Sequence, residues 1–281
     1  MKKFLLYSVI TLLFVACGQR TDNNSKRVVT VTIEPLRYFV ERIAADKFTV
    51  NTMVPAGGNP ETYEPSAQQL MALAESQLYI KVGSIGFERT WTDKLQTNAP
   101  QCTFISASKG VETIKDEHGD DDPHTWMSPK NALIIAENIC EALIQADLAD
   151  SIIFRQNLAT LKKDILRTDQ QVHTIVGNSQ TAFLVYHPVL TYYARDYGLK
   201  QLSVEREGRE PSASDLKNII AKAQQSGVET FFVQQEFANR NIDVVLSSIH
   251  ARRVLINPLS YDWDKEMINI ANELKRTSRN N

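Results

Sequence analysis

Hydrophobic and polar positions along this chain follow two different periods. Short apolar runs rich in β-branched residues, such as VVTVTI at 28–33, are typical of buried strands. Between them lie segments whose apolar residues recur at helical spacing, as in 36–45. The segments predicted as strands are 28–33, 48–54, 78–82, 103–106, 183–186, 199–204, 230–234 and 254–256. Strands that alternate with helices predict parallel sheets covered by helices, which is an α/β fold.

One predicted helix is much longer than the others. Asp150 or Ser151 is placed to cap its start, and Gly177 follows its last turn. At 1.5 Å per residue such a helix spans nearly 40 Å, roughly the width of a domain. We therefore expect two parallel-sheet α/β lobes joined by one long rigid helix. The other predicted helices are 36–45, 67–75, 87–95, 130–145, 188–197, 213–225, 241–251 and 264–275.

The first residues predict export. Lys2 and Lys3 precede an apolar run at 4–16, which is shorter than the roughly 20 residues of a membrane span and fits a secretory signal. Val15-Ala16-Cys17 resembles a lipobox, although Phe14 departs from the usual leucine. The alternative is an ordinary signal peptide with an incidental cysteine. The predicted organisation is a signal peptide at 1–16, a lipid-anchored tether at 17–27, an N-terminal lobe at 28–149, a linking helix at 150–177 and a C-terminal lobe at 178–281.

Composition narrows the function. The formal net charge is −2, so there is no basic excess of the kind that nucleic-acid binding requires. Cys102 and Cys140 are the only cysteines after Cys17, and no CxxC motif indicates a thiolate metal site. These two cysteines could pair in an oxidising compartment, but we favour two small buried side chains.

Four possible metal ligands each follow a predicted strand, where open parallel sheets bind their ligands. Glu61 lies in a loop rich in proline and glycine, and a carboxylate oxygen can ligate zinc. His124 and His187 lie in proline-marked segments, and Asn257 precedes a proline after the last strand. Each residue also has a plainer explanation as a solvated acid, a packed or capping histidine, or a turn-forming asparagine.

These segments together resemble the metal-binding receptors of bacterial ABC importers, the zinc and manganese receptors of the ZnuA or TroA type. The likeness covers nearly the whole chain after the tether. The motifs that carry it are Tyr63-Glu64-Pro65, Asp-Pro-His-x-Trp-x-x-Pro at 122–129, His-Pro-x-x-x-Tyr-x-Ala-x-x-Tyr-Gly-Leu at 187–199, Glu210-Pro211-Ser212 and Pro258-Leu259.

The resemblance implies that metal binds in the cleft between the lobes, with two ligands from each. Those positions are Glu61 and His124 in the first lobe, and His187 and Asn257 in the second. The family usually has histidine at position 61 and an acid at position 257, so the carboxylate has moved across the site. If Asn257 does not complete the coordination, the candidates are Glu205, Glu207, Glu236 or a water.

The function implied is capture of a divalent transition metal, which is then delivered to the membrane permease of an ABC importer. Two imidazoles and one carboxylate suit Zn²⁺, and Mn²⁺ or Fe²⁺ are the alternatives. An acidic loop with His118, at 118–122, is a short version of one that accompanies zinc receptors in the family. We expect a monomer in the periplasm or at the cell surface, anchored through acylated Cys17.

Two alternatives from other classes stay open. The same ligands with a bound water could form a zinc-dependent hydrolase, although the chain has no HExxH motif. The chain could also be a surface adhesin or a structural lipoprotein without metal.

Overall fold

The structure is a computed structural model of the whole chain, and it describes residues 27–115, 119–177, 182–205, 211–237 and 241–277. The predicted signal peptide, most of the tether with Cys17, and the candidates His118 and Glu207 lie outside these residues.

The first half of the chain forms a four-stranded parallel sheet in the order β2-β1-β3-β4. Each strand lies where the apolar pattern predicts it, within two residues. The strands are β1 (Arg27–Val31), β2 (Phe48–Thr52), β3 (Leu78–Lys81) and β4 (Thr103–Ser106). The helices of this half are α1 (Glu34–Ala44), α2 (Ala67–Ala74), α3 (Gly86–Asn98) and α4 (Pro129–Ala146), with the short helix η1 (Thr125–Met127) before α4.

The second half repeats this arrangement with the order β6-β5-β7-β8, again with every strand parallel. Because both sheets have the same strand order, their central strands end in loops at equivalent places. The strands are β5 (Ala182–Val185), β6 (Lys200–Ser203), β7 (Thr230–Gln234) and β8 (Arg252–Ile256). The helices are α6 (Thr191–Tyr197), α7 (Ala213–Gln225), α8 (Asn241–Ser248) and α9 (Trp263–Thr277).

Local capping signals explain where several helices begin. Ser66 and Ser212 each form a capping box, with Gln69 and Asp215 respectively. The prediction of a side-chain cap on the long helix is wrong, because Asp150 makes no capping hydrogen bond. Its carboxylate instead lies 3.1 Å from the ammonium of Lys47, so an ion pair takes the place of the cap.

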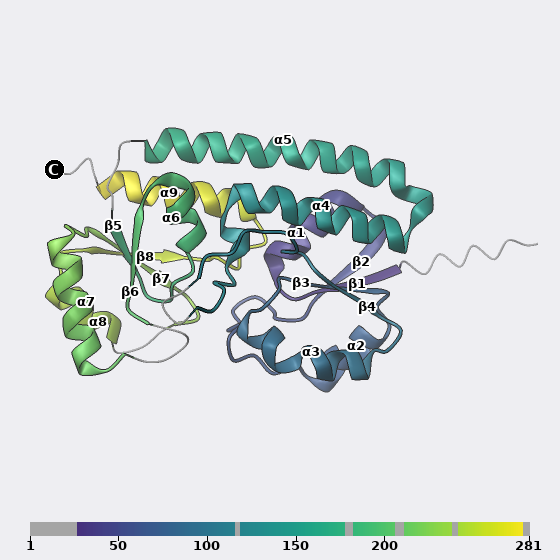
Figure 1. Cartoon of the computed structure of the whole chain (residues 1–281), viewed down its shortest axis with the longest axis horizontal. Coiled ribbons are helices and arrows are strands. Elements are labelled where there is room, and N and C mark those ends of the chain that lie inside the picture. Colours follow the sequence, from purple (N-terminus) through teal and green to yellow (C-terminus); the bar gives the residue numbers. More distant parts are fainter. Residues whose placement is uncertain (1–26, 116–118, 178–181, 206–210, 238–240, 278–281) are drawn as a thin grey trace, which may run out of the picture.

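The long helix α5 (Ser151–Val176) runs across both halves, as Figure 1 shows. It packs against α1 and α4 of the first half and against α9 of the second. Its buried side, with Phe154, Leu161, Ile165 and Val172, joins a hydrophobic core that continues from one half into the other. The predicted class, two α/β lobes joined by one long helix, is confirmed.

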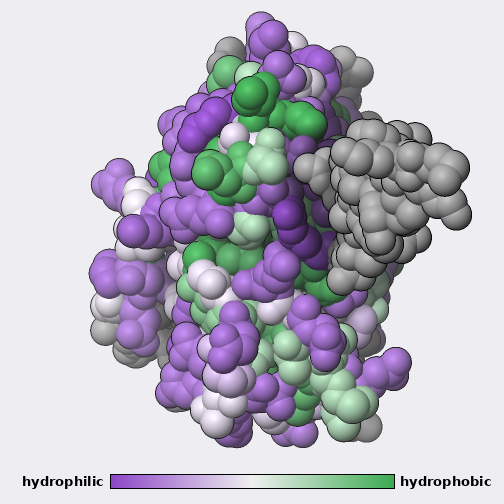
Figure 2. All heavy atoms as spheres, turned by 90° about the vertical axis from the view of Figure 1, so that its right-hand side faces the viewer, coloured by the Kyte–Doolittle hydropathy of each residue, from purple (hydrophilic) through white to green (hydrophobic). Residues whose placement is uncertain are grey.

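A few large hydrophobic side chains of the described residues are exposed to solvent. Leu148 and Ile152, where α5 begins, are 76% and 71% exposed. Figure 2, which faces the end of the molecule with the first lobe, shows groups of hydrophobic residues among hydrophilic ones on this face. Within the part of the chain that the structure describes, no helix has the length and apolar character needed to cross a membrane.

Two buried tryptophans tie the lobes together. The indole N–H of Trp126, beside His124, donates to the carbonyl oxygen of Pro258 at 2.9 Å. The indole N–H of Trp263 donates in turn to the carbonyl oxygen of Trp126 at 2.7 Å. The η1 segment of the first lobe is therefore fastened to the β8–α9 loop of the second.

Replacing Trp126 with phenylalanine tests this connection. The variant leaves the buried carbonyl of Pro258 without its donor, which should lower the free energy of unfolding by about 1–3 kcal/mol. Urea unfolding followed by circular dichroism measures the change. Trp91→Phe, at a half-buried tryptophan on α3, is the matched control and should cost less than about 1 kcal/mol. Equal losses in the two variants would contradict a special role for Trp126.

Candidate metal centre

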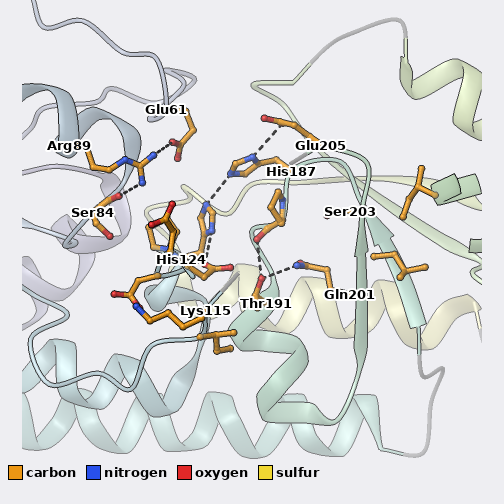
Figure 3. A pocket seen from close by; sticks show the side chains of 18 of the residues that line it. Glu61, Ser84, Arg89, Lys115, His124, His187, Thr191, Gln201, Ser203 and Glu205 are labelled. Carbon is orange, nitrogen blue, oxygen red and sulfur yellow. Dashed lines mark hydrogen bonds and ion pairs between the residues drawn. The ribbon is translucent and has the colours of Figure 1, made fainter. Parts of the chain in front are cut away.

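Two histidines from different lobes meet at the centre of the molecule. His124 precedes η1 in the first lobe, and His187 follows β5 in the second. Their Nε2 atoms lie 3.1 Å apart, and the rings stand nearly perpendicular at 81°. Only 5% of His124 and 6% of His187 is exposed. Figure 3 shows the two rings pointing toward each other across the cleft.

This spacing suits one shared cation. Two Zn–N bonds of 2.0–2.1 Å at a tetrahedral angle separate the nitrogen atoms by about 3.3 Å. The observed separation of 3.1 Å is close to that value. Little movement of either ring is therefore needed for both Nε2 atoms to hold the same ion.

Glu61 brings a carboxylate to the same place from the loop after β2. Its Oε2 accepts a hydrogen bond from the backbone N–H of Gly86 at 3.1 Å and lies 3.8 Å from the guanidinium of Arg89. Its Oε1 is buried and, within the described residues, has no hydrogen-bond partner. One oxygen of Glu61 is thus held by the protein while the other is left for a ligand.

Ligand atoms of these three residues all lie within 4.8 Å of one another. They line a cavity of about 760 Å³ at the carboxyl ends of the strands. Arg89, Lys115 and Glu205 also line it. The structure therefore brings together Glu61, His124 and His187, which are far apart in the sequence, at the seam between the lobes.

His124 is fixed by the residue two places before it. Oδ1 of Asp122 lies 2.9 Å from Nδ1 of His124 and accepts the backbone N–H of the same residue, also at 2.9 Å. The ring of Trp126 packs edge-on against that of His124, with 5.4 Å between the centroids. The contact with Asp122 is the structural role that the sequence offered as an alternative to metal binding. Because this contact uses Nδ1, it leaves Nε2 of His124 facing His187.

His187 is fixed from β7. The side-chain amide of Gln234 donates to the carbonyl oxygen of His187 at 3.0 Å and accepts its backbone N–H at 3.4 Å. The ring of Phe237 stacks on that of His187, with 4.9 Å between the centroids. The sequence reasoning missed Gln234, although its place at the end of a predicted strand was a signal that it lies at this edge of the sheet.

The charges around His124 favour a cation. Burial opposes the charged form of the His124 ring and so lowers its pKa. The charge of Asp122 and the hydrogen bond to it act in the opposite direction, as do the charges of Glu61 and Glu205. These effects outweigh burial, so the pKa of His124 is raised. Burial likewise opposes ionisation of Asp122, yet the neighbouring His124 leaves the pKa of Asp122 lowered. The same field that favours a proton on His124 favours a metal ion beside it.

Asn257, the other predicted ligand, follows β8. Its Oδ1 accepts the backbone N–H of Leu259 at 3.2 Å, and its own N–H donates to Glu266 at 2.8 Å. It is not among the described residues that line the cavity. Its turn-forming role is therefore visible in the geometry, and its role as a ligand stays a prediction.

Gly86, at the start of α3, was not singled out in the sequence. A Cβ atom there would lie 2.4 Å from Oε2 of Glu61 and 2.7 Å from its carbonyl oxygen. The loop before Gly86 is held by Glu88, which is buried and accepts the N–H groups of Val82 and Gly83 at 2.7 and 2.8 Å. The signal was present: this glycine follows a strand at the same edge as the predicted ligands.

Two α/β lobes with histidines and a carboxylate converging in the cleft define a metal-binding protein of the solute-receptor type. A sequence profile described as zinc-uptake complex component A, periplasmic, matches residues 29–275. The chain belongs to this family.

Known relatives agree in length and fold. A crystal structure of ZnuA is 33% identical, with a TM-score of 0.86 over 90% of this chain and 99% of that one. The manganese ABC transporter substrate-binding lipoprotein PsaA of Streptococcus pneumoniae is 27% identical over 87% of this chain and 86% of its own length. The high-affinity zinc uptake system protein ZnuA of Bacillus subtilis is 24% identical over 88% and 85%.

The family comprises binding components of transporters and not enzymes. The zinc-dependent hydrolase considered from the sequence is therefore set aside. Because the family is one of metal receptors, a protein that binds no metal is set aside as well, whereas a role in adhesion stays a prediction.

Replacing Gly86 with alanine tests the support of Glu61. The added methyl group must displace the Glu61 loop, so zinc affinity should fall by roughly 10–100-fold, as it does when an outer partner of a ligand is lost. Titration calorimetry on chelator-stripped protein measures the affinity. Gly83→Ala is the matched control, because a Cβ there would meet its nearest atom, Oγ of Ser106, at an ordinary 3.4 Å. Unchanged affinity in Gly86→Ala would show that Glu61 needs no such support.

Proposed function

We propose that this protein is an extracytoplasmic receptor that captures a divalent transition metal ion and delivers it to the permease of an ABC importer. The observation that carries the proposal is the approach of Nε2 of His124 and Nε2 of His187 to 3.1 Å across the lobes. A carboxylate oxygen of Glu61 within 4.8 Å of both supplies negative charge. The family relationship supplies the transport role.

The proposed ligands are Glu61, His124 and His187. Together they make a His₂-carboxylate set, which leaves one position of a tetrahedral ion for water or for Asn257. Because the ligands come from both lobes, an ion bound to all three stabilises one arrangement of the lobes. The shared core and the tryptophan pair limit the accompanying motion to a small tilt and to loop ordering.

We favour zinc as the cargo. Two imidazoles are borderline-soft ligands that suit zinc, whereas manganese prefers more oxygen ligands. Named relatives include both zinc and manganese proteins, so Mn²⁺ and Fe²⁺ remain the alternatives. Because zinc outcompetes manganese at most sites of this type, metal analysis of the protein isolated from cells supplied with both ions distinguishes them. Manganese as the principal bound ion would refute zinc as the cargo.

The described part of the chain starts at one end of the molecule, where Arg27 forms an ion pair with Asp147. We propose that the preceding residues tether the receptor to a membrane through acylated Cys17. Relatives named as lipoproteins support this placement. A single anchored chain is sufficient, because all three proposed ligands come from one copy of the protein.

Removing either histidine tests the site directly. His124→Ala and His187→Ala should each weaken zinc binding by more than about 100-fold, beyond the loss typical of an outer partner. His173→Ala, at a histidine on α5 that is 55% exposed, is the matched control and should bind zinc like the unaltered protein. Calorimetry decides the outcome. Nanomolar zinc binding in the double variant His124→Ala/His187→Ala would refute this site.

Metal should also stabilise the fold. Free zinc at 100 times its dissociation constant should raise the free energy of unfolding by about 2.7 kcal/mol, provided the unfolded chain does not bind it. Thermal unfolding with zinc, and again after addition of a chelator, measures the shift. If zinc does not change the melting temperature of the unaltered protein, this result would contradict metal binding between the lobes.

A further inference from the structure

The second histidine of the site has a carboxylate behind it, as the first does. Nδ1 of His187 lies 3.4 Å from Oε2 of Glu205, the second residue after β6. Figure 3 shows Glu205 directed at the His187 ring from the second lobe. On the other side of the site, Asp122 stands in the corresponding position at Nδ1 of His124.

Glu205 is deeply buried, with 3% of its surface exposed. Within the described residues, Oε2 of Glu205 and Nδ1 of His187 are both buried atoms without a hydrogen-bond partner. A buried carboxylate is costly unless it is paired, and each of these atoms is the complement of the other. The backbone holds them together, because the N–H of Glu205 donates to the carbonyl oxygen of Tyr186, next to His187, at 2.8 Å.

A neutral imidazole carries one proton, on Nδ1 or on Nε2. When a neutral imidazole binds a metal through Nε2, its proton is on Nδ1. A carboxylate beside Nδ1 can then accept a hydrogen bond from this N–H group. We propose that Glu205 is a positioning residue, which accepts the Nδ1–H of His187 and so presents the Nε2 lone pair to the metal. This inference rests on the proposed function of the site.

The geometry separates this role from direct ligation. Glu205 lies at Nδ1, whereas the facing atom of His124 lies at Nε2 of the same ring. The described carboxylates and histidines whose ligand atoms cluster within 4.8 Å are Glu61, His124 and His187, without Glu205. Each lobe therefore contributes one histidine with a carboxylate near its Nδ1.

The test combines a spectroscopic readout with affinity. Glu205→Ala and Glu205→Gln are prepared with ¹⁵N-labelled histidine and stripped of metal. Long-range ¹H–¹⁵N spectra, recorded above the pH at which histidines titrate, report which ring nitrogen of His187 carries the proton. Calorimetry with zinc gives the affinity, and thermal unfolding checks that each variant is folded.

In the unaltered protein the spectra should show His187 protonated on Nδ1. Glu205→Ala should shift the ring toward the other tautomer and weaken zinc binding by about 10–100-fold. Glu205→Gln keeps the shape of the side chain and an acceptor oxygen but loses the charge. Its zinc affinity should therefore lie between that of the unaltered protein and that of Glu205→Ala. Glu141→Gln is the control: this carboxylate on α4 pairs with Arg155 at 2.9 Å and does not line the cavity, so zinc affinity in the variant should not change.

Two results would overturn the inference. The first is a Glu205→Ala variant whose His187 ring shifts equal those of the unaltered protein and whose zinc affinity is within twofold of it. That result would show that Glu205 does not position His187. Loss of binding as complete as in His187→Ala would make Glu205 a ligand instead. Either result leaves the proposed function intact as long as His124→Ala and His187→Ala abolish binding, so the two failures are distinguishable.

Discussion

The rest of the structure depends on the close approach of two imidazoles that belong to different sheets. His124 and His187 can keep 3.1 Å between their Nε2 atoms only if the lobes hold a fixed separation. The continuous core beneath α5 and the hydrogen bonds of Trp126 and Trp263 provide that constraint. Packing far from the cleft is therefore part of the site, because neither lobe can define it alone.

Two of the three proposed ligands, His124 and Glu61, follow one physical scheme. The protein engages one polar atom of the side chain and leaves another, buried, for a cation. Asp122 occupies Nδ1 of His124, and the N–H of Gly86 occupies Oε2 of Glu61. The unpartnered Oε1 of Glu61 and the carboxylates near His124 attract positive charge, which explains why the field around His124 acts on a proton in the same direction as on a metal ion.

The sequence carried most of the fold, because strand and helix periods are local properties. The three residues that converge were also predictable, since each follows a strand in a distinctive loop. The supports of these residues were not predictable in the same way. Gln234 and Gly86 act through the backbone of segments distant in sequence, which only the folded arrangement brings into contact. Asp150 is a case in which local sequence misleads. Helix-capping rules predict that its carboxylate caps α5, but it forms an ion pair with Lys47 from a distant segment instead.

The lack of a side chain at Gly86 has a consequence for how receptors of this fold can diverge. The space that a methyl group would fill is occupied by Glu61 itself. A related chain with a larger residue at this place could not accept the same carboxylate by a single exchange at position 61. Two of the three atoms that exclude such a residue are the carbonyl oxygen and the Cα of Glu61, so with this backbone the wall must stay free of a side chain whichever ligand stands at position 61.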